Sequence, residues 1–154
     1  MEAQKELTIR RFKSEDALAV SKVIRATLLT SNIADYSLDI LQPLHDYFTP
    51  SKVAILATER YCLVAAYDKL IVATGAFEDG ELKTIFVLPL YQGLGIGKQL
   101  IKQLEKRAKA ENVETMKVPA SISGVPFYEK LGYQKIKTFI SKNAGQQTLM
   151  SKDL

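Results

Sequence analysis

Hydrophobic positions along the chain follow two periods, which predict an alternation of strands and helices. Short apolar or alternating runs between turn residues are typical of strands. Such runs occupy residues 7–12, 61–66, 70–77, 81–88, 115–118, 133–140 and 147–152. Apolar residues at steps of three and four, with capping residues before them, are typical of helices that bury one face. We expect such helices at residues 14–28, 50–59, 96–108 and 121–131.

The segment between the first two of these helices has the least clear pattern. Apolar residues recur from Leu38 to Tyr47, but Pro43 interrupts them, so we expect a short or broken helix there. Thr49 and Pro50 then supply a cap and a proline at the first helical position, which is a clear restart. The resulting element order is β-α-α-β-β-β-α-β-α-β-β, a mixed α/β (α+β) arrangement.

Length and composition indicate an ordinary globular protein with one domain, residues 1–154. Hydrophobic residues make up 47% of the chain and charged residues 25%. The single cysteine, Cys62, excludes an internal disulfide framework and a multi-cysteine zinc site, and we predict no metal. The charged start lacks the apolar core of a signal peptide, and no apolar run approaches a membrane span of about 20 residues. We therefore expect a cytoplasmic protein without membrane association.

The charge is unevenly distributed, although the net charge is only +4. Residues 31–50 carry three acids and no Lys or Arg, whereas residues 82–154 carry twelve Lys or Arg and five acids. One interpretation is a solvated basic surface, and the other is that the second half holds a polyanionic ligand. No Lys/Arg cluster comes with interleaved aromatic residues, so nucleic acid is not favoured.

A glycine-rich turn, residues 92–98, lies between a predicted strand and an amphipathic helix. Its glycines allow a tight turn with exposed N–H groups, and the helix start adds about half a positive charge. Together these features favour a phosphate or pyrophosphate ligand, the alternative being a loop that only turns tightly. Spacing excludes two common phosphate loops. Gly93 and Gly97 stand too close for a Walker A loop, and the third glycine comes one residue early for the dinucleotide fingerprint.

The turn resembles the Q/R-x-x-G-x-G/A pattern of the GNAT acetyltransferase family, with Gln92 as the first residue and Gly97 as the last. Residues 82–89 are similar to the fourth strand of that family. Residues 120–133 contain a block similar to its Phe-Tyr-x-x-x-Gly-Phe/Tyr segment, and residues 149–154 are similar to its last strand. The resemblance therefore covers essentially the whole chain.

This resemblance implies the GNAT acyl-CoA acyltransferase fold: a twisted mixed sheet of about seven strands, with splayed fourth and fifth strands and about four helices. It also implies that acetyl-CoA lies in the splay, with its pyrophosphate on the turn and its pantetheine on the fourth strand. The implied cofactor-binding residues are Phe86, Val87, Leu88, Gln92, Gly93, Leu94, Gly95, Ile96, Gly97, Lys98 and Ser121. One departure is Pro119, which stands where the family often has an asparagine that contacts pantetheine.

Two side chains are candidates for catalysis by this resemblance. Tyr128 corresponds to the family's tyrosine near the thioester sulfur, and its phenol could donate a proton to the leaving thiolate. Glu81 lies eleven residues before Gln92, the offset of the base in the histone-acetyltransferase branch. Each has a structural alternative: Tyr128 could cap the core, and Glu81 could be a solvated residue at a strand end. The oxyanion donor is expected to be a backbone N–H of residues 86–87.

The function expected on this basis is transfer of an acetyl group from acetyl-CoA to a primary amine, by direct attack in a ternary complex. A covalent route through Cys62 and His45 is disfavoured, because Cys62 lies in an apolar run typical of a buried thiol. The alternatives are a non-catalytic acyl-CoA-binding sensor or interaction module and a small nucleotide-binding protein.

The sequence leaves the acceptor and the oligomeric state open, a homodimer among the possibilities. We expect a cationic acceptor, because aromatic residues accompany the three acids of residues 31–50 and ring faces attract ammonium groups. These acids are Asp35, Asp39 and Asp46. The alternative is that they only solvate a surface helix.

Overall fold

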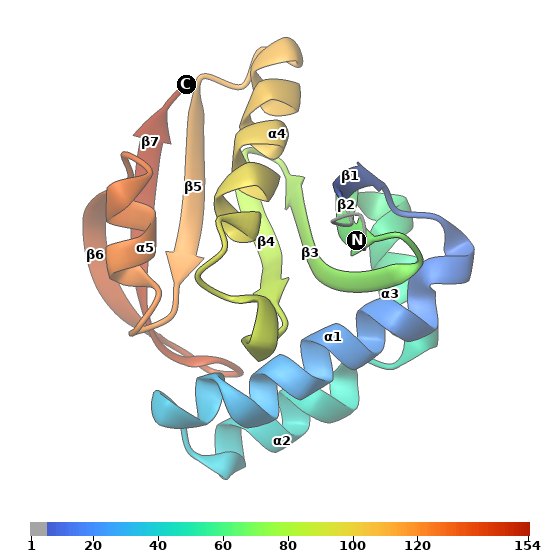
Figure 1. Cartoon of the computed structure of the whole chain (residues 1–154). Helices are drawn as coiled ribbons and strands as arrows, with labels where there is room; N and C mark the ends of the chain where they lie inside the picture. Colours follow the sequence, from blue (N-terminus) through green and yellow to red (C-terminus); the bar gives the residue numbers. More distant parts are fainter. Residues whose placement is uncertain (1–5) are drawn as a thin grey trace.

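Seven strands form one mixed sheet in the computed structural model, which describes residues 6–154 (Figure 1). The strands are β1 (Leu7–Arg11), β2 (Tyr61–Tyr67), β3 (Leu70–Glu78), β4 (Glu81–Val87), β5 (Thr115–Ala120), β6 (Gln134–Ser141) and β7 (Gly145–Asp153). Their order across the sheet is β1-β2-β3-β4-β5-β7-β6. Every neighbouring pair is antiparallel except β4 and β5, which are parallel. The predicted mixed sheet is confirmed.

Five α-helices connect these strands, one more than expected. They are α1 (Ala17–Thr30), α2 (Leu38–Tyr47), α3 (Pro50–Glu59), α4 (Ile96–Ala110) and α5 (Val125–Lys130). The additional helix is α2, which runs through Pro43. Proline removes one N–H from a helix. Burial of Leu41, which is fully enclosed in the core beside α1, offsets that loss.

The α-helix of α1 begins later than the helix expected from residue 14. Residues 14–16 form a 3-10 turn, and the α-helix begins at Ala17. Asp16 is the residue that organises the turn: its carboxylate accepts a hydrogen bond from the Lys13 N–H at 2.8 Å and pairs with Arg10 at 2.7 Å. The hydrogen bond from Arg10 lowers the pKa of Asp16. This buried ion pair therefore anchors β1 to the beginning of α1.

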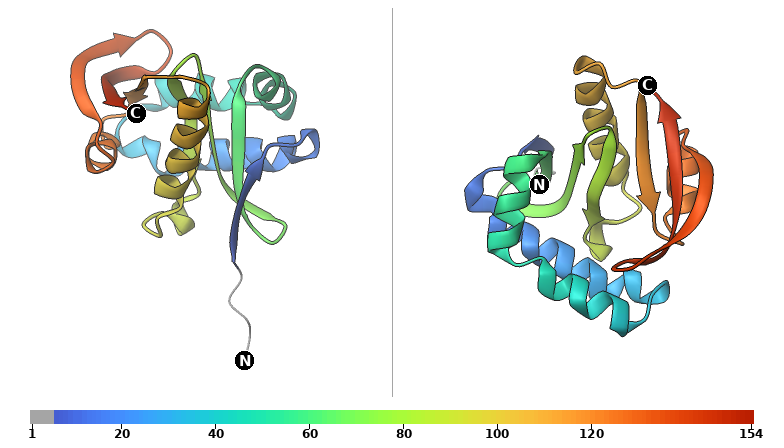
Figure 2. Two further views of the ribbon diagram at one scale, coloured as in Figure 1. Left: turned by 90° about the horizontal axis from the view of Figure 1, so that it is seen from above. Right: turned by 180° about the vertical axis from the view of Figure 1, so that it is seen from behind.

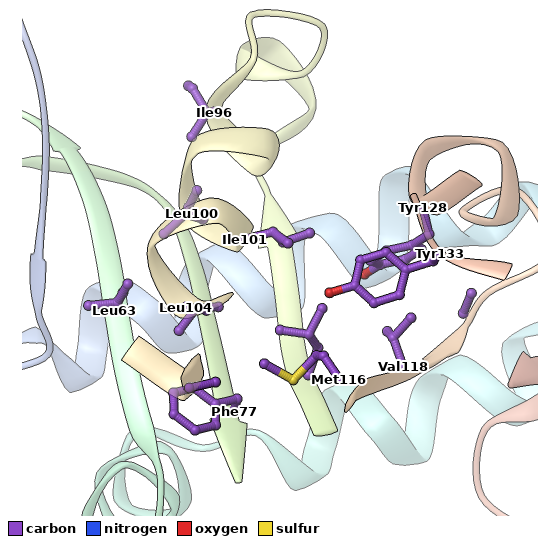
Figure 3. Packing of buried hydrophobic residues seen from close by; sticks show 14 of the residues in the cluster. Leu63, Phe77, Ile96, Leu100, Ile101, Leu104, Met116, Val118, Tyr128 and Tyr133 are labelled. Atoms are coloured by element: carbon purple, nitrogen blue, oxygen red, sulfur yellow. The ribbon is translucent and has the colours of Figure 1, made fainter. Parts of the chain in front are cut away.

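Helices cover both faces of the sheet and divide the core into two clusters. Figure 2 shows α4 and α5 on one side and α1, α2 and α3 on the other. The α4 side packs Leu100, Ile101 and Leu104 against the strands, with Tyr128 and Tyr133 next to them (Figure 3). The α1 side packs Val20, Ile24 and Leu28 against the same sheet. The burial of one apolar stripe per helix explains the sequence periodicity.

Polar contacts that we call the clasp join the α1–α2 connection to the β5–α5 loop and to β7: Asp35 and Tyr36 with Ile122, Ser123 and Gln146. The Tyr36 hydroxyl donates to the Gln146 carbonyl at 2.7 Å and accepts from the Ile122 N–H at 3.2 Å. Asp35 Oδ2 accepts from the Ser123 N–H at 3.0 Å and from its hydroxyl. In Figure 1 the tip of the β6–β7 hairpin accordingly reaches the α1–α2 region.

Replacement of Tyr36 by phenylalanine should destabilise the fold, because two backbone groups lose their partner near a buried ring. We expect a loss of about 1–3 kcal/mol in the free energy of unfolding. The matched control is Tyr47→Phe, whose exposed hydroxyl makes no hydrogen bond within residues 6–154. Urea unfolding midpoints measure both. Equal unfolding midpoints for the two variants would show that the hydrogen bonds of Tyr36 in the clasp do not stabilise the fold.

Candidate functional site

A cavity of about 970 Å³ opens between β4 and β5. Residues from both faces of the sheet line it: the turn before α4 and parts of α5 from one side, and parts of α1 and α2 from the other. The cavity thus connects the two faces through the gap in the sheet. A ligand on one face can reach a second ligand on the other without crossing a strand.

The gap exists because β4 and β5 pair at one position only, Glu81 with Lys117. There the Lys117 N–H donates to the Gly80 carbonyl at 2.8 Å. Backbone groups of a strand alternate between its two edges, so the nitrogen of residue 119 faces the same way as that of Lys117. Residue 119 is Pro119, which has no N–H to donate. This proline therefore prevents β5 from extending its pairing with β4.

β4 also bends where the two strands separate. Its register against β3 shifts between the pairs Thr74–Phe86 and Ala76–Lys83, which leaves one extra residue on β4. Such a bulge bends a strand and increases its twist. Thr84 lies in this bulge with φ of 50°, a rare conformation for a β-branched residue. Strain of this kind is concentrated at functional sites.

The end of β4 presents backbone groups to the cavity. The Leu88 N–H donates to the Val72 carbonyl of β3 at 2.9 Å, so the alternation of the ladder directs the N–H and C=O of Val87 to the opposite edge. The Val87 carbonyl accepts hydrogen bonds from Gln92 Nε2 at 2.9 Å and from Thr27 Oγ1 at 3.4 Å. Its N–H is left as a donor aimed into the gap.

The turn before α4 has the backbone geometry that an anion cradle requires. Gly93 and Gly95 have φ of 78° and 82°, values that glycine adopts without strain, and α4 begins directly after Gly95. A Cβ at Gly97 would lie 3.1 Å from Phe127, so the absence of a side chain lets α5 approach α4. Lys98 and Lys130 line the same end of the cavity. N–H groups at a helix start and two cations favour a phosphate ligand there.

Tyr128 lines the cavity, and its side chain is almost fully enclosed, with 7% of the residue exposed. Burial raises the pKa of its phenol, so the hydroxyl stays protonated at neutral pH. Within residues 6–154 this hydroxyl has no hydrogen-bond partner, and no buried side-chain oxygen or nitrogen in this part of the chain lacks one, so the Tyr128 oxygen is accessible from the cavity although the ring is buried. The Tyr128 hydroxyl is therefore a protonated donor that is available to a ligand in the cavity.

The neighbouring Tyr133 behaves differently, although its ring centroid is only 5.7 Å from that of Tyr128 (Figure 3). Its hydroxyl donates to Glu105 Oε2 at 2.8 Å, and Lys152 Nζ approaches the other carboxylate oxygen at 3.1 Å. Burial and the bond to Glu105 both raise the pKa of Tyr133. This network ties α4 to β7 and holds the ring that packs on Tyr128.

Glu81 lies at the closed end of the gap and lines the cavity, with 37% of its side chain exposed. It belongs to a group of four charges from the sheet and the end of α3. Lys83 Nζ is 3.8 Å from Glu81 and 4.0 Å from Glu78. Arg60 Nε is 3.3 Å from the same Glu78 oxygen. We refer to Arg60, Glu78, Glu81 and Lys83 as the charge quartet.

Most of the residues predicted for the site lie together around the cavity. Those that line it are Glu81, Phe86, Val87, Gln92, Gly93, Gly95, Ile96, Gly97, Lys98, Ser121 and Tyr128. Two do not. Leu94 is exposed on the outside of the turn, and Leu88 packs into the core while its N–H pairs with β3.

None of the three acids expected to recognise a cationic acceptor lines the cavity, whereas Tyr36 and Phe48 of the same segment do. Asp35 instead binds Ser123, and Asp46 accepts hydrogen bonds from His45 at 3.0 Å and Gln42 at 3.1 Å. Asp39 lies exposed in the first turn of α2, where a negative charge stabilises the helix start. Cys62 is buried outside the cavity, and burial raises the pKa of its thiol.

Sequence reasoning included Tyr36 among the aromatic residues expected to meet the acceptor, but it did not identify Thr27, Arg60 or Lys83, which also line the cavity. Only the position of Lys83 two residues after Glu81, on the same strand face, could have indicated one of them. Among residues 6–154, no three His, Cys, Asp or Glu side chains gather in a way that could hold a metal ion. No helix in this part of the chain is long and apolar enough to cross a membrane.

Comparison with known proteins agrees with this geometry. Residues 32–154 match the family model described as an acetyltransferase (GNAT) domain. A Bacillus subtilis (strain 168) protein, whose name places it provisionally among the acetyltransferases, is 30% identical over 73 residues. That match covers 47% of this chain and 50% of the relative, so the chain spans about half of that protein.

Two solved structures share the fold over nearly the whole chain. A GCN5-related N-acetyltransferase from Rhodopseudomonas palustris has a TM-score of 0.88, with 23% identity and 100% of each chain covered. The PaiA N-acetyltransferase from Thermoplasma acidophilum, in complex with coenzyme A, has a TM-score of 0.83 and 18% identity, and 97% of this chain and 99% of that chain are covered. With the family model matched across β2 to β7 and the splayed sheet in place, this chain belongs to the GNAT acetyltransferase family.

Proposed function

We propose that the chain acts as a single domain that transfers an acetyl group from acetyl-CoA to a primary amine, by direct attack in a ternary complex. The observation that carries the proposal is the cavity through the sheet, which offers an anion cradle on one side and a separate charged region on the other. A thioester and an amine can enter from opposite faces and meet in the gap. Such positioning lowers the entropic cost of a two-substrate reaction.

In this proposal the coenzyme lies along the α4 side of the gap. Its pyrophosphate binds the N–H groups at the start of α4, where Lys98 and Lys130 add positive charge. The Val87 N–H donates a hydrogen bond to the acetyl carbonyl oxygen of the acyl-pantetheine chain. The same hydrogen bond stabilises that oxygen when it becomes an oxyanion. Of the two expected donors, residues 86 and 87, Phe86 pairs with Thr74 of β3. Val87 is therefore the one whose N–H points into the gap. Coenzyme A bound to the Thermoplasma relative supports this choice of ligand.

Tyr128 is the proposed donor to the departing thiolate. A free thiol has a pKa near 8.5 and a phenol near 10, and burial raises the pKa of Tyr128 further. The phenol therefore stabilises the thiolate with a hydrogen bond and passes it a proton as the C–S bond breaks. The phenol regains a proton from the attacking nitrogen, which loses one when the C–N bond becomes an amide. The free Tyr128 hydroxyl supports this role, because no protein group among residues 6–154 competes with a ligand in the cavity for its proton.

Glu81 is the proposed base. An amine with a pKa near 10.4 must lose a proton before it attacks, which costs about 4.6 kcal/mol at pH 7. A carboxylate at the closed end of the gap can accept that proton directly or through a water molecule. The position of Glu81 on β4, where it lines the cavity, supports this role.

Acetyl-CoA should raise the melting temperature, since a ligand at 100 times its Kd adds about 2.7 kcal/mol of stability. Gly95→Asp should remove most of this effect by placing a negative charge at the cradle. Gly95→Asn is the matched control, because asparagine also tolerates a positive φ but carries no charge. Thermal unfolding with and without acetyl-CoA measures both. An equal shift in Gly95→Asp and Gly95→Asn would place the pyrophosphate elsewhere.

Tyr128→Phe should lower kcat by about 10²-fold or more while the KM for acetyl-CoA changes little, because only the transition state needs the phenolic proton. The ring and its contacts with Phe127 and Tyr133 remain. Tyr47→Phe serves as the control for loss of an exposed hydroxyl. Release of coenzyme A thiol measures the rates. If kcat is unchanged in an assay where the chemical step limits the rate, Tyr128 contributes only to packing.

A further inference from the structure

We propose that the acceptor is a small amine that also carries an anionic group, a carboxylate or a phosphate, and that Arg60 and Lys83 hold this anion. The inference rests on the proposed acetyl transfer and identifies the class of the second substrate. It starts from the charge quartet, three of whose members, Arg60, Glu81 and Lys83, line the cavity, while Glu78 pairs with Arg60 and Lys83 from behind.

Arg60 is the main reason for an anionic group. Only 15% of its side chain is exposed, yet it lines the cavity. Its Nε donates to Glu78, whereas its two terminal nitrogens make no hydrogen bond within residues 6–154. A guanidinium presents its donors in a rigid fork that matches the oxygens of a carboxylate or a phosphate. No buried side-chain nitrogen of residues 6–154 lacks a partner, so these two terminal nitrogens are accessible, and a ligand oxyanion in the cavity that Arg60 lines can bind them.

The other charges of the quartet define where the amine lies. Lys83 stands between Glu78 and Glu81, so positive and negative groups alternate across the end of the cavity. An acceptor with one ammonium and one anion can pair its ammonium with Glu81 and its anion with Arg60 and Lys83. A polycation would instead meet two cationic side chains, since none of the three aspartates of residues 31–50 lines the cavity.

The clasp is the reason for a small acceptor. Hydrogen bonds of Asp35 and Tyr36 to the β5–α5 loop and to β7 bridge the open end of the gap. In Figure 1 the β6–β7 hairpin tip and the α1–α2 region meet across it. An extended polypeptide would have to displace these contacts to bring a lysine or an amino terminus into the cavity. A molecule of a few atoms would not.

Matched pairs of amines test this inference. Phosphoethanolamine is compared with ethanolamine, and alanine with alaninamide, first by calorimetric binding to protein saturated with coenzyme A and then by thiol release from acetyl-CoA. A short peptide with a free amino terminus and spermidine complete the panel. We expect the anionic member of at least one pair to bind and react about 10- to 100-fold better, as charge-assisted hydrogen bonds of this kind predict.

Arg60→Gln and Lys83→Gln identify the residues responsible. Each should reduce the preference for the anionic amine over its neutral counterpart by about 10-fold or more and leave the melting shift caused by acetyl-CoA unchanged. Lys137→Gln, on the exposed strand β6, is the matched control for loss of one positive charge. The acetyl-CoA melting shift reports whether each variant folds, and Lys83→Gln carries the test if Arg60→Gln does not.

The outcomes separate the two proposals. If acetyl-CoA binds and reacts but neutral amines, spermidine or the peptide are preferred, the anionic-acceptor inference is wrong and acetyl transfer stands. If the preference survives both substitutions, Arg60 and Lys83 do not provide it and the inference is again wrong. If acetyl-CoA itself does not bind, the proposed function fails and the inference fails with it.

Discussion

The separation of β4 and β5 is the constraint on which the rest of the structure depends. The two strands pair at Glu81 and Lys117 and nowhere else, while β5 is paired along its whole length with β7, and β4 with β3 except at its bulge. Pro119 removes the donor that would continue the ladder from β5, and the bulge at Thr84 bends β4 away from it. A parallel pair left open in this way would expose backbone groups to water. Here they line the cavity in which we propose that the coenzyme binds.

Keeping the gap open requires support on both faces. The α4 cluster joins β2–β4 to β5 and β7 through Leu104, Met116 and Met150, and the bond between Tyr133 and Glu105 adds a polar tie. On the other face the clasp joins the α1–α2 region to the hairpin. These contacts hold the two parts of the sheet at a fixed separation. They also explain why the hydroxyl of Tyr128, whose ring is buried, can face a cavity that stays open.

The strands and the turn before α4 could be predicted from the sequence, because period, glycine spacing and the helix start are local features. The full extent of α2 could not be predicted because Pro43 interrupts its pattern. The burial of Leu41, which offsets the hydrogen bond lost at the proline, is a tertiary contact. Asp35 illustrates the same limit: its charge is evident in the sequence, but its bond to Ser123, 88 residues away, is not. Arg60 ends a helix without any motif, and only the fold brings it to Glu78 and the cavity.

The central claim is that the open edge of β4 binds the acyl-pantetheine chain. Amide hydrogen exchange of Val87, measured by NMR with and without saturating acetyl-CoA, tests it most directly. Leu88 is the internal control, because its N–H already donates to Val72. The account predicts that the Val87 amide exchanges rapidly in the free protein and becomes protected with acetyl-CoA, while Leu88 is protected in both. A Val87 amide that exchanges equally fast in both states would contradict the account.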